Sequence, residues 1–256
     1  MYEKLVADVK YLEGDYATAA SMYLEGARDG DAQASFNYAY CLWRGRGVDY
    51  DPASAKSYFA FARDVGEGES SYNLAMLYMH GEGVTRDYKR AYEYMCRSAD
   101  DGCLEAILYL GMLYTTGYML EPEVIGISMI PYHKPEYLSE LSFLDGYVPD
   151  LESDEDARAS VVRPDARRAF ECFMRASRHD PTYVEELVAK GKFLYARCFV
   201  DGLGTDADWH KGARLMLRAA DAGSADAAIY IAENGISREL LKSDKKPFRR
   251  LGTGKR

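Results

Sequence analysis

A repeat of 36 residues constrains the fold of this chain more than any other feature of its sequence. Glycines recur at this spacing in two columns, and small or large apolar residues recur in phase with them. The glycine columns are Gly30, Gly66 and Gly102, then Gly45, Gly81 and Gly117; the apolar columns are Ala19, Ala55 and Ala91, then Tyr23, Phe59 and Met95, then Ala39, Ala75 and Gly111. Columns that stay in phase over three copies predict a repeat architecture in which each copy is one supersecondary unit.

Each copy carries two helical patterns. Ala19 and Tyr23 lie four residues apart on one helical face, and Ala34 and Tyr38 do so in the next segment. Gly30 separates the two segments, and a left-handed residue that ends a helix is cheap only for glycine. Each unit is therefore predicted to be a pair of helices.

The pattern returns near the C-terminus after an interruption. Gly117 and Gly202 are 85 residues apart instead of 36. Part of the excess predicts a lengthened second helix spanning about Thr182–Asp201. The rest forms an insertion over residues 119–163, which holds ten acidic and three basic residues.

The junction between the two helices identifies the repeat type. It reads ARDGDAQA at 27–34 with a GRGV turn, and ADAGSADA at 220–227 with GLGT before it. These segments resemble Sel1-like repeats, relatives of the tetratricopeptide repeat. The resemblance implies an all-α, right-handed superhelix, or solenoid, of about five helix pairs, in which units stack because none can bury its apolar face alone.

Five segments follow from this interpretation. They are an N-terminal packing helix at 1–13, Sel1-like repeats 1–3 at 14–118, the acidic insertion at 119–163, repeats 4–5 at 164–235, and a basic tail at 236–256. The insertion is either a folded lid or a solvated loop. In the lid interpretation the apolar run Val124–Ile130 is buried and the acidic stretch Glu152–Asp156 is exposed.

Charge and composition restrict the partners. The net charge is −9, and because the tail is +6, residues 1–235 carry −15. Such a body repels nucleic acid and anionic lipid, so neither a nucleic-acid partner nor a membrane is expected. The chain has no apolar run long enough to span a bilayer and no signal-peptide core at its start. Five cysteines that do not repeat in pairs predict free thiols and a cytoplasmic, reduced protein.

The sequence contains no convincing catalytic, cofactor or metal motif. The four histidines are scattered without metal-ligand spacing, and the paired glycines follow helices, whereas a dinucleotide loop follows a strand. No catalytic residue, cofactor or metal is therefore expected. Some cysteine-rich Sel1-like proteins resemble β-lactamases in activity, which makes a hydrolase the alternative. Its S-x-x-K signature occurs only at Ser243–Lys246, without partner motifs.

The predicted function is a non-catalytic scaffold that binds a peptide or partner protein along the concave face. Tyrosine suits such a surface because it offers a large contact area at small entropic cost. The candidate binding residues are Tyr16, Met22, Tyr58, Arg90, Tyr94 and Cys172. The same tyrosines could instead pack between repeats. A third possibility is a regulatory partner of nucleic-acid enzymes that acts through the basic tail.

Overall fold

The computed structural model describes residues 3–65, 69–117, 162–180, 185–239 and 241. Within these ranges the protein is all-α. Gly66, nearly all of the insertion and most of the basic tail lie outside them. The expectations for Val124–Ile130 and Glu152–Asp156 therefore also lie outside the described residues.

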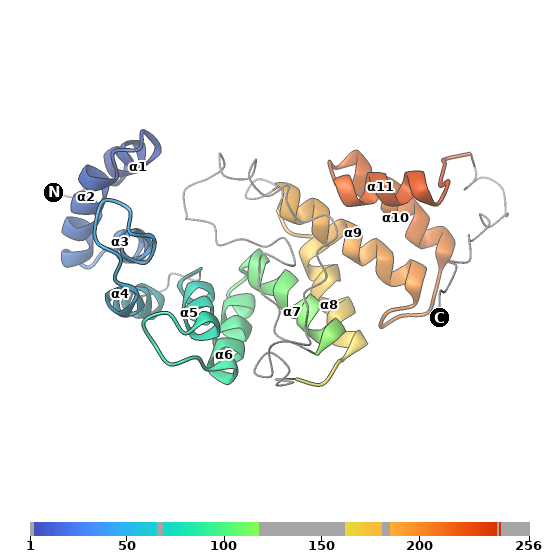
Figure 1. Ribbon diagram of the computed structural model, residues 1–256. Coiled ribbons are helices and arrows are strands. Elements are labelled where there is room, and N and C mark those ends of the chain that lie inside the picture. The colour runs from blue at the N-terminus through green and yellow to red at the C-terminus, as the bar shows by residue number, and fades with distance from the viewer. Residues whose placement is uncertain (1–2, 66–68, 118–161, 181–184, 240, 242–256) are drawn as a thin grey trace, which may run out of the picture. The chain divides into compact units, whose positions relative to one another are not determined.

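The described residues form eleven helices, a leading helix followed by five consecutive pairs (Figure 1). This confirms the predicted all-α helix-pair fold. In chain order the helices are α1 (Lys4–Leu12), α2 (Tyr16–Arg28), α3 (Ala32–Arg44), α4 (Pro52–Asp64), α5 (Glu69–His80), α6 (Tyr88–Asp100), α7 (Leu104–Thr116), α8 (Ala166–Ser177), α9 (Glu185–Asp201), α10 (Trp209–Asp221) and α11 (Ala225–Glu233).

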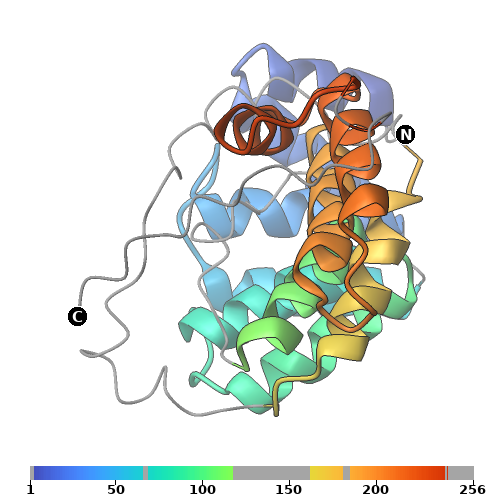
Figure 2. The same cartoon turned by 90° about the vertical axis from the view of Figure 1, so that its right-hand side faces the viewer.

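The helices belong to two compact units. The first ends at Leu110, and the second comprises Gly111–Gly117 together with the chain from Val162 onward. In the first unit α3 packs against both α2 and α4, and α5 packs against both α4 and α6. In the second unit α9 packs against α8 and α10, and α10 and α11 are in contact (Figures 1 and 2). Each helix is therefore held by its neighbours in sequence, as expected for a repeat array.

An aspartate begins the first helix of every pair. Its carboxylate accepts a hydrogen bond from the backbone N–H three residues later, which satisfies one of the donors that a helix start leaves unpaired. These caps are Asp15, Asp51, Asp87, Asp165 and Asp208, with N···O distances of 3.3, 3.0, 3.0, 3.0 and 3.0 Å.

The same aspartates join each pair to the preceding one. The backbone N–H of Asp51 donates to the carbonyl of Leu42 at 2.9 Å, and that of Asp87 donates to Tyr78 at 2.9 Å. The second unit repeats the bond at two further junctions, Asp165 to Tyr114 and Asp208 to Phe199, each at 2.8 Å. Each of these aspartates thus caps its own helix and also bonds the start of that helix to the end of the preceding one.

The glycine columns have two distinct causes. Gly30 and Gly102 have φ of 85° and 96°, which confirms that they end the first helices in the left-handed conformation. The second glycine of each G-x-G turn has a further constraint. A Cβ on Gly47 would lie 2.1 Å from the carbonyl oxygen of Tyr16, at the start of the first helix of the same pair. The sequence pattern predicts a turn residue at this position, and the close approach of the Tyr16 backbone requires glycine there as well.

The α9 helix has 17 residues, whereas the other described helices have 9 to 13. It ends at Asp201, as the spacing predicts. The predicted start at Thr182 lies outside the described residues, which resume at Glu185. The helix contacts α8 closely, because a Cβ on Gly191 would lie 2.9 Å from that of Ala176.

Candidate functional site

The candidate site comprises side chains on the first helices of the pairs. Met22, Tyr58, Tyr94 and Cys172 occupy the same column, just before the large buried residue of α2, α4, α6 and α8, and all four are half-buried. Of the remaining candidates, Tyr16 is also half-buried and Arg90 is exposed. Five of the six lie in the first unit and Cys172 lies in the second, so only the five are considered together here.

The three tyrosines each pack against a ring of the preceding helix. Tyr16 meets Tyr11 at a centroid distance of 5.0 Å and Tyr58 meets Tyr38 at 4.9 Å, both edge to face. Tyr94 stacks on Tyr78 at 5.6 Å with 13° between the rings. These tyrosines therefore pack between repeats, as one of the two interpretations expects, and they also keep part of their surface accessible.

Arg63 and Arg90 contact the stacked rings of Tyr94 and Tyr78. Arg63 donates from Nη1 to the hydroxyl of Tyr94 at 3.1 Å, and its guanidinium carbon lies 5.5 Å from the ring centroid. Arg90 lies over Tyr78 at 5.6 Å and forms an ion pair with Asp87 at 3.4 Å. Such contacts between a cation and an aromatic ring are attractive and favour the observed orientation of the rings.

The contact between Arg90 and Tyr78 recurs along the chain. In the second unit Arg168 lies over Tyr114 at 5.5 Å, and the ammonium of Lys211 lies over Phe199 at 3.9 Å. In each case the cation is the third residue after the capping aspartate, and the ring is the third residue before the glycine that follows the helix, which is Gly81, Gly117 or Gly202. We call this position the cation column. Sequence reasoning had singled out only Arg90, although aligning the two columns would have revealed the series.

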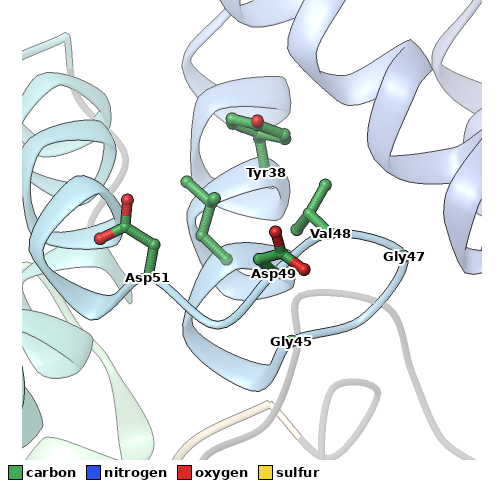
Figure 3. A pocket seen from close by; sticks show the side chains of 7 residues that line it. Tyr38, Gly45, Gly47, Val48, Asp49 and Asp51 are labelled. Carbon is green, nitrogen blue, oxygen red and sulfur yellow. The ribbon is translucent and has the colours of Figure 1, made fainter.

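A cavity of about 680 Å³ opens at the junction of α3 and α4 in the first unit. Its wall combines an aromatic ring, apolar side chains, a glycine turn and two carboxylates: Tyr38, Leu42, Gly45, Gly47, Val48, Asp49 and Asp51. Figure 3 shows Asp51 to the left of α3 and Asp49 in front of the lower part of this helix, with Tyr38 above them. The cavity adjoins the candidate surface, because Tyr38 packs against Tyr58.

The thiols show no arrangement for nucleophilic chemistry. All five cysteines are free, and burial raises the pKa of both Cys41 and Cys198 to about 12. The thiolate is the reactive form, so these two side chains serve as small core residues. Among the described residues, no group of three or more histidine, cysteine, aspartate or glutamate side chains could hold a metal ion.

These features define the class of protein as an α/α repeat solenoid. The family model of the Sel1 repeat matches residues 32–66, 68–103, 159–181 and 189–224, which is half of the chain. The chain belongs to the Sel1 repeat family. The two matches in the first unit begin at α3 and α5, so the family model counts each repeat from the second helix of the pairs described above.

Solved structures agree on the fold. The chain is similar to a Sel1 repeat protein from Oxalobacter formigenes, with a TM-score of 0.63, 16% identity, and coverage of 90% of this chain and 75% of that one. It is also similar to c5321, a protective antigen of uropathogenic Escherichia coli with an SLR fold, with a TM-score of 0.63 and 21% identity. That match covers 91% of this chain but only 41% of the antigen. No curated protein matches the sequence.

No helix within the described ranges is both long enough and apolar enough to cross a bilayer.

Proposed function

We propose that this protein is a non-catalytic scaffold that binds a peptide or partner protein along its concave face, which is predicted to be lined by the first helices of the pairs. The observation that carries the proposal is the row of half-exposed tyrosines, Tyr16, Tyr58 and Tyr94, each held by a ring of the preceding helix. Rigid aromatic side chains lose little entropy on binding and are enriched among residues that dominate interface energies. The fold supports this proposal, because stacked repeats present extended binding surfaces.

No observation favours the two alternatives. The described cysteines and histidines form no catalytic grouping that supports a hydrolase, and Ser243–Lys246 lie outside the described residues, as does most of the basic tail. The five free thiols support a reducing compartment, and we propose the cytoplasm on that basis.

The proposal is tested by comparative capture of partners from an extract of the source cells. The intact chain and a variant carrying Tyr58→Ala and Tyr94→Ala are used as baits, and the captured proteins are identified by mass spectrometry. Tyr50→Ala is the matched control, because Tyr50 is 58% exposed but lies in the turn between α3 and α4. Partners should be retained by the control and lost from the double variant.

Because Tyr58 and Tyr94 also pack between repeats, the thermal midpoint of the double variant is measured beside its binding. A double variant that unfolds cooperatively and still captures every partner of the intact chain would refute the proposal. Where the double change weakens the fold, Tyr94→Phe removes only the hydroxyl that accepts from Arg63 and gives a milder second measurement.

A further inference from the structure

One junction between pairs lacks the cation column. At the other three junctions considered above, an arginine or lysine lies over an aromatic ring beside a capping aspartate. At the junction of α3 and α4 the corresponding residues are Ser54 and Leu42. The capping aspartate, Asp51, remains, and so does its bond to the carbonyl of Leu42. The backbone geometry is therefore kept, while both the ring and the cation are missing.

The cavity of about 680 Å³ lies at this same junction. Leu42, which lines the cavity, and Ser54 are both smaller than Tyr78 and Arg90, their counterparts at the junction of α5 and α6. The cavity is widely open to solvent, and its lining is more polar than apolar. At the other three junctions a guanidinium or an ammonium group lies over the ring that stands in the place of Leu42, and we expect the cavity to accept a group of that kind.

The charge of the cavity matches such a group. Asp49 is exposed and forms no hydrogen bond or ion pair with the described part of the chain. At the junction of α5 and α6 the residue in the place of Asp49 is the neutral Thr85. The α3–α4 junction thus has Asp49 and Asp51 but no cation in the cation column, whereas at the α5–α6 junction Asp87 forms an ion pair with Arg90.

No basic residue in the described part of the chain forms an ion pair with Asp49 or Asp51. Arg44 and Arg46 lie over the rings of other residues, at 4.4 Å from Trp43 and 5.3 Å from Tyr16. Arg28 is close enough to influence Tyr38 electrostatically, but no described ion pair joins it to Asp49 or Asp51.

We propose that the α3–α4 cavity binds an arginine side chain from an extended basic segment of a partner protein. The inference rests on the proposed scaffold function and names the chemistry of its partner. The planar guanidinium can donate to a carboxylate through two parallel hydrogen bonds and can pack on an aromatic ring. Asp49 and Asp51 supply the carboxylates and Tyr38 supplies the ring, and the contact of Tyr38 with Tyr58 joins the cavity to the proposed binding surface.

The test is a titration of the ¹⁵N-labelled full chain with a blocked peptide, acetyl-Gly-Gly-Arg-Gly-Gly-amide, followed by NMR. The control peptide carries citrulline, which has nearly the shape of arginine but no charge. The arginine peptide should shift the backbone amides of Gly45, Gly47 and Asp49. Its affinity should exceed that of the citrulline peptide roughly tenfold or more, because hydrogen bonds to charged groups are the stronger ones.

Two variants locate the site. Asp49→Asn should weaken the arginine peptide by about tenfold, whereas Asp206→Asn should leave it unchanged, because the junction that contains Asp206 already holds Lys211 over Phe199. The combined change Leu42→Tyr and Ser54→Arg rebuilds the missing cation column and should abolish binding. Asp51 is left intact because it caps α4.

Any one of three results would overturn the inference. They are equal binding of the two peptides, equal losses of affinity from Asp49→Asn and Asp206→Asn, or full binding by the variant with the rebuilt cation column. A chain that lacks residues 242–256 tests whether the tail itself occupies the cavity. Shifts of the backbone amides of the cavity on this deletion would show that the tail fills the site and would also overturn the inference. Partners that require Tyr58 and Tyr94 but bind normally to Asp49→Asn would leave the scaffold standing and remove only the arginine site.

Discussion

Gly111 provides the sharpest test of how adjacent pairs pack. It is buried in α7, and a Cβ built on it would lie 2.5, 2.8 and 3.0 Å from Cε1, Cδ1 and Cζ of Phe173 in α8. Phe173 is itself only 2% exposed and sits in the large apolar column of the repeat. The ring therefore has little room to retreat, and a side chain at residue 111 must displace part of the core.

Two opposing effects determine the magnitude. Gly→Ala in a helix interior is worth about 1 kcal/mol in favour of alanine, whereas overpacking a well-packed core costs about 1–3 kcal/mol. Gly111→Ala should consequently lower the free energy of unfolding by about 1 kcal/mol. Gly111→Leu adds three more carbons to a contact that is already too short, and should cost about 3 kcal/mol. The thermal midpoint of that variant should fall by roughly 6 to 12 °C.

The assay is urea and thermal unfolding followed by circular dichroism, with Thr115→Ala as the control. Thr115 is exposed one turn further along α7, so this change alters helix preference without touching Phe173 and should stabilise slightly. A double-mutant cycle then isolates the contact. Phe173→Leu should cost about 1–2 kcal/mol alone, but less in the Gly111→Ala background, because the added methyl fills the space that the ring leaves.

The reasoning would be refuted in either of two ways. Gly111→Ala could stabilise the protein by the full helix-propensity gain, which would mean that nothing is close to residue 111. Alternatively, the cycle could show coupling below about 0.5 kcal/mol, the level at which residues behave as independent.

Four further outcomes are expected. Asp87→Ala removes the cap of α6 and should cost about 1 kcal/mol in urea unfolding, and an unchanged midpoint would contradict that role. The hydrogen bonds from Ser54 lower the pKa of Asp51 in the folded protein. The stabilisation that the Asp51 carboxylate contributes is therefore present above the pKa of the unfolded chain, and it is lost as the pH falls through the pKa of the folded protein. Asp51→Asn should flatten the acid side of the stability curve measured from pH 6 to pH 2. Thiol titration of the unfolded, unreduced protein should count five free groups, while Cys41 and Cys198 should resist alkylation in the folded protein at pH 8, because burial raises their pKa to about 12. Replacing residues 119–163 by a short turn should leave a helical, cooperatively unfolding protein with altered partner binding, as checked by circular dichroism and a binding assay; non-cooperative unfolding would show instead that the insertion belongs to the core.

The sequence alone determined the fold class and the order of the helices. Pairing of helices, the glycines that end them and the extra length of α9 all follow from residues close together in the chain, and the 36-residue period repeats that local information several times. Such features depend on backbone conformation and on helical spacing, which sequence patterns report directly.

Tertiary structure decided what lies between the pairs. Gly47 is required by a backbone 31 residues earlier in the chain, and Tyr58 both packs on Tyr38 and remains accessible. The cavity at Asp49 lies at the one junction, of the four considered above, that lacks a ring and a cation in the cation column. Each of these features depends on how two stacked helices approach each other, and that distance is set by packing of side chains far apart in sequence.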